Sequence, residues 1–189
     1  MRVYLAGPDV FLPDAAAIGT AKKAICARHD LTGVFPLDAI EDVASAAAPE
    51  HFMQIYWQNE AHIRSCDALI ANLTPFRGPS ADVGTIYELG LMRGLGRPVF
   101  GYTNAALPFR ERTLRFLGDA AVRRAEDDWE DAEGLHLENF SLHDNLMIDG
   151  GIRACGGKVI ARAVPEEDRW TDMAAFEECV AALAAKLRN

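Results

Sequence analysis

Residues 67–73 read Asp-Ala-Leu-Ile-Ala-Asn-Leu, a nearly continuous apolar run of strand length. A strand with apolar side chains on both faces is typical of a parallel sheet that helices cover on both sides. A loop with Pro75, Gly78 and Pro79 follows, and the apolar segment 82–96 then has the character of a helix. This strand, loop and helix together predict an α/β protein with its sheet in the middle.

The rest of the chain continues the same alternation. Short β-prone runs predict further strands at residues 2–6, 33–35, 97–102 and 158–163. Apolar residues at helical spacing predict helices at residues 14–29, 50–65 and 170–187, the second of them burying Phe52, Ile55, Tyr56 and Ile63. Strands separated by helices imply right-handed βαβ crossovers. We therefore expect a three-layer α/β fold with a mostly parallel sheet of about five strands.

Three segments stand outside this pattern. Residues 104–138 are charged and poorly periodic, which predicts a surface insertion with helices outside the sheet. Residues 38–48 are polar and small and are expected to form a loop with weak helical character. Residues 165–189 carry the closing helix. With 189 residues, half of them hydrophobic, the whole chain 1–189 is predicted to form a single domain.

The charge of the chain limits its partners. The formal net charge is −9, and the basic residues are scattered among acidic ones. A protein that binds the phosphate backbone needs clustered Lys and Arg, so a long nucleic acid is not an expected partner. A nucleobase or a nucleoside remains a possible ligand.

The cysteines and the apolar runs indicate the compartment. Cys26, Cys66, Cys155 and Cys179 lie far apart, without a Cys-x-x-Cys pair, and are interpreted as small, mostly buried side chains. No apolar run reaches the roughly 20 residues of a membrane helix. The opening MRVYLAG is strand-like rather than a charged leader. These features predict a cytoplasmic protein with reduced thiols and no membrane partner.

Common cofactor motifs are missing from the sequence. The five histidines show no metal-ligand spacing, so no metal site is expected. Gly94-x-Gly96 and Gly150-Gly151 are too sparse for a dinucleotide fingerprint, and no Gly-Lys-Ser/Thr phosphate loop is present. A Ser or Cys nucleophile would need a base that the sequence does not identify.

Ligands of open parallel sheets bind outside the carboxyl ends of the strands. The expected ends lie at residues 7–11, 36–38, 74–82 and 102–103; three of the four carry an Asp, and the fourth carries the aromatic residue Tyr102. Gly7 and Gly78 would let a ligand approach the backbone. Tyr4 stands just before the first of these ends, which makes it a candidate site residue.

Two carboxylates flank a glycine at the start of the helix 82–96. Asp82 is at the expected N-cap, where its side chain would accept a backbone N–H. Glu88 lies among apolar residues, one helical turn from Gly84, which leaves open space beside it. A carboxylate in apolar surroundings is usually either paired or functional, and both interpretations of Glu88 stay open at this point.

Three blocks of sequence resemble the nucleoside 2-deoxyribosyltransferase family. They are VYLAGPDVF at 3–11, CDALIANLTPFRGPSADVGTIYELG at 66–90 and DNLM at 144–147, in the family's order. The middle block is the specific one. With their connecting helices the blocks span residues 2–148. The resemblance implies a flavodoxin-like (Rossmann-like) fold and cleavage of the N-glycosidic bond of a 2′-deoxynucleoside.

The resemblance also assigns roles to residues. Glu88 matches the nucleophilic carboxylate, Tyr4 the tyrosine that orients it, and Asp82 the acidic residue near the sugar 5′-hydroxyl. Asn145 matches an asparagine donated to a neighbouring subunit's site, and Met147 closes the same pocket. The resemblance therefore implies a homo-oligomer, at least a dimer.

The base subsite departs from the family pattern. Phe11 resembles an aromatic residue that stacks on the base. Members of the family often have an Asp on the helix before the strand 67–73, but the matching residue here is Asn59. An amide cannot supply a proton to the leaving base. Asp38, at the end of the second strand, is an alternative contact for the base.

The implied chemistry is transfer of 2-deoxyribose between nucleobases through a covalent glycosyl-Glu intermediate, with hydrolysis as a side reaction and no cofactor. Its substrates are a deoxynucleoside and a free nucleobase. Two alternatives stay open. A deoxynucleoside 5′-monophosphate N-glycosidase would typically have a Ser where this chain has Asp82, although Arg77 and Ser80 lie nearby. A non-catalytic sensor of nucleotide derivatives would not need Tyr4, Asp82 and Glu88 together.

Overall fold

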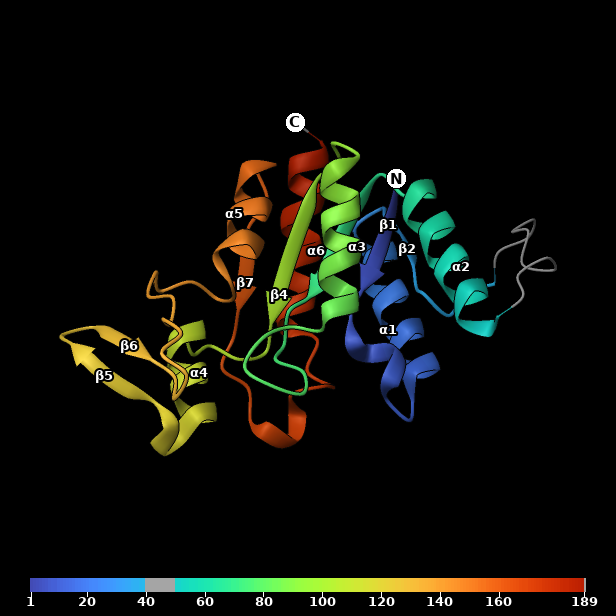
Figure 1. Ribbon diagram of the computed structural model, residues 1–189. Helices are drawn as coiled ribbons and strands as arrows, with labels where there is room; N and C mark the ends of the chain where they lie inside the picture. Colours follow the sequence, from blue (N-terminus) through green and yellow to red (C-terminus); the bar gives the residue numbers. More distant parts are fainter. Residues whose placement is uncertain (40–49, 189) are drawn as a thin grey trace.

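A five-stranded parallel sheet runs through the molecule (Figure 1), with the strand order β2-β1-β3-β4-β7. The strands are β1 (Arg2–Ala6), β2 (Thr32–Val34), β3 (Ala68–Asn72), β4 (Val99–Thr103) and β7 (Val159–Ala161). This computed structural model describes residues 1–39 and 50–188. The parallel α/β architecture predicted from the sequence is confirmed, and its strand order is of the flavodoxin type.

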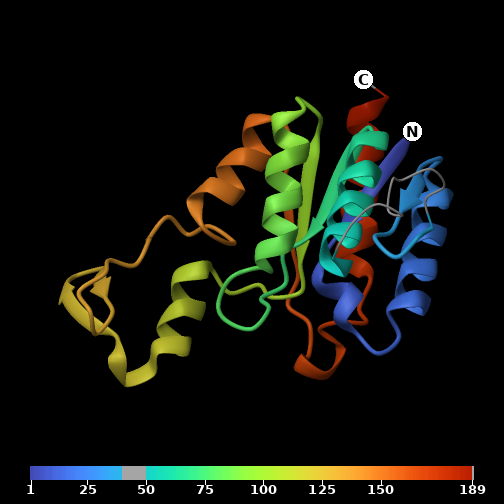
Figure 2. The same ribbon diagram turned by 45° about the vertical axis from the view of Figure 1, so that its right-hand side comes forward.

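Helices cover both faces of the sheet (Figures 1 and 2). One face packs on α1 (Ala15–Arg28) and α6 (Ala174–Leu187). The other face packs on α2 (His51–Ser65), α3 (Val83–Gly94) and α5 (Leu146–Ala154). The short 3-10 helices are η1 (Pro8–Phe11), η3 (Gly118–Ala120) and η4 (Glu166–Asp168). The result is the predicted three-layer arrangement.

The central strand β3 explains why the run at 67–73 is apolar. It pairs with β1 on one side and with β4 on the other, and all five of its residues are buried. Its register places Leu69 opposite Tyr4 and Asn72 opposite Tyr102. Because β2 lies on one side of β1 and β3 and the later strands lie on the other side, the order in which strands are added to the sheet reverses between β1 and β3. The carboxyl ends of these two strands mark the usual ligand crevice of such sheets.

The segment after β4 differs from the prediction. Residues 104–138 were expected to carry surface helices, but they hold one α-helix, α4 (Phe109–Leu117), followed by η3 and a hairpin. The hairpin strands β5 (Val122–Ala125) and β6 (Asp128–Glu130) pair in antiparallel fashion, away from the main sheet (Figure 1). Asp127 turns the hairpin with a φ of 59°, a conformation that Asp tolerates better than most residues.

Helix α5 was not predicted at all. It contains Gly150 and Gly151, each of which disfavours a helix by about 1 kcal/mol relative to Ala. The helix forms because Asn145 caps its N-terminus and because Ile148 and Ile152 are buried against the sheet. The closing helix α6 begins at Ala174, four residues after the expected start.

The predicted buried side of α2 is wrong for three of its four residues. Ile63 is 1% exposed, but Phe52, Ile55 and Tyr56 are 63%, 47% and 37% exposed. Only the C-terminal half of α2 buries its side chains, against β1 and α3. On α3, Tyr87 is likewise 57% exposed. An apolar stripe on a helix therefore did not guarantee that another element of the described chain covers it.

Within the described ranges, no helix combines the length and the apolar character that crossing a membrane requires. Most of the predicted loop 38–48 lies outside the described residues. Cys26, Cys66 and Cys179 are buried and Cys155 is half-buried, and all four are free thiols.

Candidate active site

Tyr4 and Glu88 meet between the sheet and helix α3. Tyr4 lies in β1 between β2 and β3, and its side chain is fully buried. Its hydroxyl donates a hydrogen bond of 2.7 Å to Oε1 of Glu88. Glu88 lies in the middle of α3, and its side chain is half-buried. The predicted pairing of these two residues in space is thus present in the fold.

Glu88 lies on the wall of a cavity of about 260 Å³ between α2 and α3. The cavity is lined by Tyr56, Asn59, Glu60, Ile63, Gly84, Tyr87, Glu88 and Leu91. Gly84 precedes Glu88 by four residues, so both face α2. A Cβ at Gly84 would meet only the Asp82 carboxylate, at 3.1 Å, so the space beside Glu88 is open. A ring-sized group can therefore approach the carboxylate from this side.

The surroundings of Glu88 change its acidity. Burial raises the pKa of the Glu88 carboxyl to about 7. The hydrogen bond from Tyr4 acts in the opposite direction, and the negative charge of Asp82 raises the pKa further. Burial, and then the adjacent Glu88, also raise the pKa of the Tyr4 phenol far above its usual value. Tyr4 therefore remains a protonated donor at neutral pH, while Glu88 exchanges its proton there.

Asp82 is the N-cap of α3, as expected from its position. Its Oδ2 accepts hydrogen bonds from the backbone N of Thr85 at 2.9 Å and from Thr85 Oγ1 at 3.0 Å. Both bonds use the same oxygen, and Oδ1 accepts no hydrogen bond from the described residues. One carboxylate can therefore cap the helix and still offer an acceptor to a ligand.

Three further predicted residues lie outside the cavity. Gly7 follows β1, and a Cβ there would come within 2.3 Å of the Asp9 carboxylate, so close internal packing explains this glycine. Phe11 is 59% exposed and stacks on Phe76 at 5.4 Å. Asp38 accepts a hydrogen bond from the backbone N of Phe35 and forms an ion pair of 2.5 Å with Lys23. Of the predicted base contacts, only Asn59 lines the cavity.

The DNLM segment packs on the loop before Asp82. Asp144 is fully buried and accepts hydrogen bonds from Ser80 Oγ at 2.5 Å and from the backbone N of Ala81 at 2.9 Å. Asn145 caps α5, accepts a hydrogen bond from the backbone N of Met147, and donates another to Glu138. Met147 is 74% exposed. Neither Asn145 nor Met147 lines the cavity of Glu88 in its own chain.

The chain is similar to known proteins over most of its length. The profile described as nucleoside 2-deoxyribosyltransferase matches residues 3–147, which include both Tyr4 and Glu88. The chain belongs to this family. It is 33% identical, over 99% of its length, to an uncharacterized protein from Schizosaccharomyces pombe, of which the match covers 90%.

Two solved structures are similar to this family member. A 2-deoxyribosyltransferase from Leishmania mexicana is 32% identical, with a TM-score of 0.57 over 78% of this chain and 84% of that one. A conserved protein from Enterococcus faecalis is 22% identical, with a TM-score of 0.56 over 100% of this chain and 99% of that one. The second likeness concerns the fold alone.

The cavity beside Glu88 has a tyrosine pair that was not predicted from the sequence. Tyr56 on α2 and Tyr87 on α3 both line it, and their hydroxyls lie 3.2 Å apart. Their ring centroids are 6.3 Å apart, with the planes tilted by 58°. Both rings are partly exposed, so the pair stands toward the solvent side of the cavity. The sequence feature that could have indicated Tyr56 is its helical spacing with Asn59 and Ile63, which line the same cavity.

A buried ion pair was also missed. Lys22 Nζ lies 2.7 Å from Oδ2 of Asp9, and the two side chains are only 2% and 1% exposed. Asn72 Nδ2 lies 3.2 Å from both oxygens of Asp9, and Thr74 donates its backbone N–H to Asn72 Oδ1. These residues connect α1 with the carboxyl ends of β1 and β3. Tyr4 lies in β1, close to this connection.

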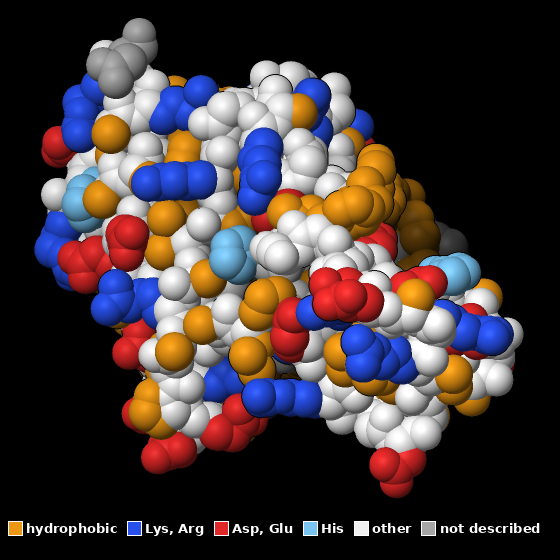
Figure 3. Space-filling view, turned by 90° about the vertical axis from the view of Figure 1, so that its left-hand side faces the viewer, with side chains coloured by type: hydrophobic (Ala, Val, Ile, Leu, Met, Phe, Trp, Pro, Cys, Tyr) orange, Lys and Arg blue, Asp and Glu red, His pale blue; other side chains and the backbone are white. Residues whose placement is uncertain are grey.

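The charged side chains do not indicate a metal or a basic groove. In the part of the chain that the structure describes, no group of three or more His, Cys, Asp or Glu side chains could hold a metal ion. On the face that carries the hairpin, Lys and Arg are intermixed with Asp and Glu (Figure 3). This face of the deoxyribosyltransferase-family chain offers no continuous basic stripe for a phosphate backbone.

Proposed function

We propose that the protein transfers 2-deoxyribose between nucleobases by cleaving the N-glycosidic bond of 2′-deoxynucleosides. The observation that carries this proposal is the hydrogen bond of 2.7 Å between Tyr4 and Glu88 at the wall of an open cavity. Membership of the nucleoside 2-deoxyribosyltransferase family supports it. So does the likeness to the Leishmania mexicana 2-deoxyribosyltransferase.

In the first step, the ionised carboxylate of Glu88 attacks C1′ of the sugar. A bond forms between a Glu88 oxygen and C1′, and the bond from C1′ to the base nitrogen breaks, with its electron pair leaving on the base. Deoxyribose lacks the electron-withdrawing 2′-hydroxyl, so the oxocarbenium-like transition state is accessible. Tyr4 holds Oε1, and no described residue donates a hydrogen bond to Oε2, which supports Oε2 as the attacking atom.

In the second step, a nitrogen of another base attacks C1′ and displaces Glu88. Two displacements at the same carbon retain its configuration, as in retaining glycosidases. Water in place of the base gives hydrolysis as a side reaction. Asn59 can hydrogen-bond the base but cannot supply a proton to it. This favours a leaving base that takes its proton from water or from another group.

Asp82 favours nucleosides over nucleotides as substrates. Its carboxylate could accept a hydrogen bond from a free 5′-hydroxyl through Oδ1 while Oδ2 caps α3. The same negative charge would repel a 5′-phosphate. The Ser80 hydroxyl, which could otherwise donate a hydrogen bond to a 5′-phosphate, already donates one to Asp144. These contacts support transfer from nucleosides over the alternative activity of a 5′-monophosphate N-glycosidase.

A second copy of the chain would complete the pocket. Asn145 and Met147 do not line the cavity of their own chain, and Met147 is 74% exposed. We therefore assign them to the neighbouring subunit's cavity, in at least a dimer. Specific activity is then expected to fall when the protein is diluted below the dissociation constant of the dimer.

The deciding experiment incubates the protein with one 2′-deoxynucleoside and a second free base, and follows the products by chromatography. Exchange of the base is expected, and Glu88→Ala is expected to abolish it while Phe52→Ala, on the exposed end of α2, retains it. A folded wild-type protein that neither exchanges nor releases a base would refute the proposal. Cleavage of 5′-monophosphates alone would favour the hydrolase. Binding of a nucleotide derivative without any product would favour a sensor.

A further inference from the structure

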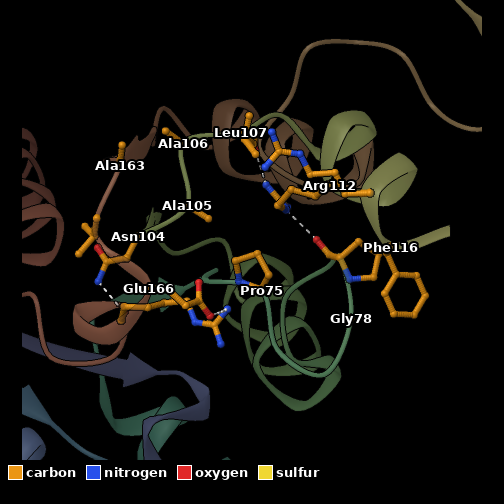
Figure 4. A pocket seen from close by; sticks show the side chains of 14 residues that line it. Pro75, Gly78, Asn104, Ala105, Ala106, Leu107, Arg112, Phe116, Ala163 and Glu166 are labelled. Carbon is orange, nitrogen blue, oxygen red and sulfur yellow. Dashed lines mark hydrogen bonds and ion pairs between the residues drawn. The ribbon is translucent and has the colours of Figure 1, made fainter. Parts of the chain in front are cut away.

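A second cavity lies beyond the carboxyl ends of β4 and β7. It has a volume of about 730 Å³ and shares no lining residue with the cavity of Glu88. Its walls come from the loop after β3, the segment after β4, helix α4 and the segment after β7 (Figure 4). A cavity of this size is in the range of small-molecule sites.

The charge of this cavity is opposite to that of the chain. The whole sequence has a net charge of −9, yet the cavity is lined by Arg112, Arg115 and Arg169 and by a single acidic residue, Glu166. Arginines gathered around a cavity in an acidic protein favour an anionic ligand, because the guanidinium group bonds carboxylate and phosphate oxygens in a fork.

Two of the three arginines are available to a ligand. Arg112 donates to the carbonyl oxygens of Pro79, Leu107 and His143, at 2.6 to 2.8 Å, so its role is structural. Arg115 is exposed on α4 and forms no hydrogen bond or ion pair with the described residues. Arg169 pairs with Glu166 at 2.8 Å, but the Glu166 side chain is 77% exposed. An ion pair with one largely exposed partner is weak, so a ligand anion can take the place of Glu166.

Arg169 and Asn104 also carry polar atoms without partners. Arg169 Nε and Asn104 Oδ1 are buried and form no hydrogen bond with the residues at 1–39 and 50–188. Asn104 is 4% exposed, and its Nδ2 donates to the carbonyl oxygens of Arg169 and Asp172, which fixes the amide. A buried polar group without a hydrogen-bond partner destabilises the fold, because its lost hydration is not replaced. A ligand with both an acceptor and a donor would offset that cost.

The remaining walls are apolar. They include Pro75, Pro79, Leu107, Phe116 and Val164. In Figure 4, Pro75 lies near the centre of the side chains drawn, with Leu107 above it and Phe116 to its right. Such walls suit a flat, weakly polar body rather than a bare inorganic ion.

From these features we infer that the cavity is a second ligand site for an anion of nucleotide size. A phosphate or carboxylate group contacts Arg115 and Arg169, and a flat body packs on the apolar wall that includes Pro75 and Phe116. A nucleoside monophosphate and an aromatic carboxylate share this chemistry. The inference goes beyond deoxyribosyl transfer and does not rest on it, because neither Arg115 nor Arg169 lines the Glu88 cavity.

Isothermal titration calorimetry tests the site with four probes. The probes are 2′-deoxyadenosine 5′-monophosphate, 2′-deoxyadenosine, inorganic phosphate and benzoate. Arg115→Gln and Arg169→Gln remove the proposed contacts, and Arg93→Gln makes the same charge change at an exposed position on α3 that lines neither cavity. Glu88→Ala reports whether a probe binds in the other cavity instead.

We expect the monophosphate to bind at least tenfold more tightly than either the nucleoside or phosphate. Each of Arg115→Gln and Arg169→Gln is expected to weaken that binding by about 10-fold or more, since bonds to charged groups are among the stronger ones. Arg93→Gln and Glu88→Ala are expected to leave it unchanged. Tight binding of benzoate, with the same dependence on Arg115 and Arg169, would assign the site to a carboxylate.

Three results would overturn the inference. The first is that neither the monophosphate nor benzoate binds to the wild-type protein. The second is binding that Glu88→Ala abolishes, which would place the anion in the Glu88 cavity. The third is binding that Arg93→Gln weakens as much as the two cavity variants do, since that would reflect the overall charge only.

Discussion

Tyr4 Oη and Glu88 Oε1 lie 2.7 Å apart although 84 residues separate them in the chain. The central strands set this distance, because Tyr4 lies in β1 opposite Leu69 of β3, and α3 packs on both strands. The pair joins a buried phenol to a carboxylate with a raised pKa. This combination of positioning and tuned acidity is typical of an active site.

Tyr4→Phe removes the hydrogen bond that lowers the pKa of Glu88. As the proposed nucleophile, Glu88 must be ionised, so activity is expected to rise with pH through the pKa of its carboxyl, which is about 7 in the wild type. The variant is expected to lose about 10- to 100-fold in kcat/KM, as for other positioned donors. The midpoint of its pH–rate profile is expected to move above that of the wild type. An unchanged midpoint would contradict the proposed contact between the two side chains.

Glu88→Gln is expected to stabilise the protein relative to the wild type, and to do so more at pH 8 than at pH 4. In the unfolded chain the carboxyl ionises near its ordinary pKa of 4.5, whereas in the fold it ionises near 7. Between these values the unfolded state binds fewer protons, so the free energy of unfolding of the wild type falls as pH rises. The loss is on the order of 3 kcal/mol.

The measurement is urea unfolding of wild type and Glu88→Gln at pH 4, 6 and 8. The difference in unfolding free energy between them should grow in favour of the variant across this range. A constant difference would show that Glu88 titrates alike in the folded and unfolded states. The same variant is expected to have no transferase activity.

A segment of the fold could be predicted from the sequence where its own residues indicate which elements pack against it. The apolar run at 67–73 correctly predicted a buried strand, because β3 is covered on both faces and paired on both edges. The apolar stripe on α2 did not predict burial correctly, because Phe52 and Ile55 fit a helical period but no described element covers them. Helix α5 was missed because its stability comes from tertiary burial and a cap rather than from local propensity.

The site divides in the same way. Glu88 and Tyr4 could be named from the residues that resemble the family, and Asp82 from its position at the start of a helix. Tyr56 and Tyr87 could not, because their pairing depends on how α2 and α3 are placed side by side. Sequence patterns report which side of one helix is apolar, but they do not report which residues of two helices face each other.

Asp82 can be tested with two substitutions that separate its cap from its charge. Asp82→Asn keeps a good N-cap and removes the charge that raises the pKa of Glu88, so the midpoint of the pH–rate profile is expected to fall. Asp82→Ala loses the cap as well and is expected to cost about 1 kcal/mol of stability. Both are expected to raise KM for deoxynucleosides.

The charge of Asp82 also makes a prediction about substrates. Asp82→Asn is expected to increase the ratio of kcat/KM for a 5′-monophosphate to that for the matching nucleoside, because the repulsion of the phosphate is gone. Steady-state assays with 2′-deoxyadenosine and its 5′-monophosphate measure this ratio. If the ratio stays at the wild-type value, Asp82 does not face the 5′ end of the substrate.

The buried ion pair of Lys22 and Asp9 is expected to be important for stability. Lys22→Met leaves Asp9 buried without its cation and is expected to cost about 3–5 kcal/mol in the free energy of unfolding. The double variant Lys22→Met/Asp9→Asn removes both charges and is expected to recover much of that loss. The exposed pair of Arg28 and Glu177 is the matched control, and Arg28→Met is expected to change stability far less. Equal losses at the two pairs would contradict this account.

The tyrosine pair at the cavity is expected to select the base. The ring of each tyrosine offers a surface for stacking, and the two hydroxyls, 3.2 Å apart, can donate to and accept from the edge of a nucleobase. Tyr56→Phe and Tyr87→Phe remove one hydroxyl each and keep the ring. Each is expected to change the ratio of kcat/KM between deoxyadenosine and deoxycytidine by about 2- to 10-fold, the usual worth of one neutral hydrogen bond.

The matched control for the tyrosines is Phe52→Leu, an exposed aromatic position on α2 that does not line the cavity. It is expected to leave the ratio between the two substrates unchanged. Calorimetric binding of free adenine and free cytosine gives a readout that needs no turnover. If both tyrosine variants lower kcat/KM equally for every base and bind the free bases as the wild type does, the pair acts on the shape of the cavity and not on base choice. A change confined to one class of base, purine or pyrimidine, would identify which edge the hydroxyls contact, since the two classes present different donors and acceptors beside the glycosidic nitrogen.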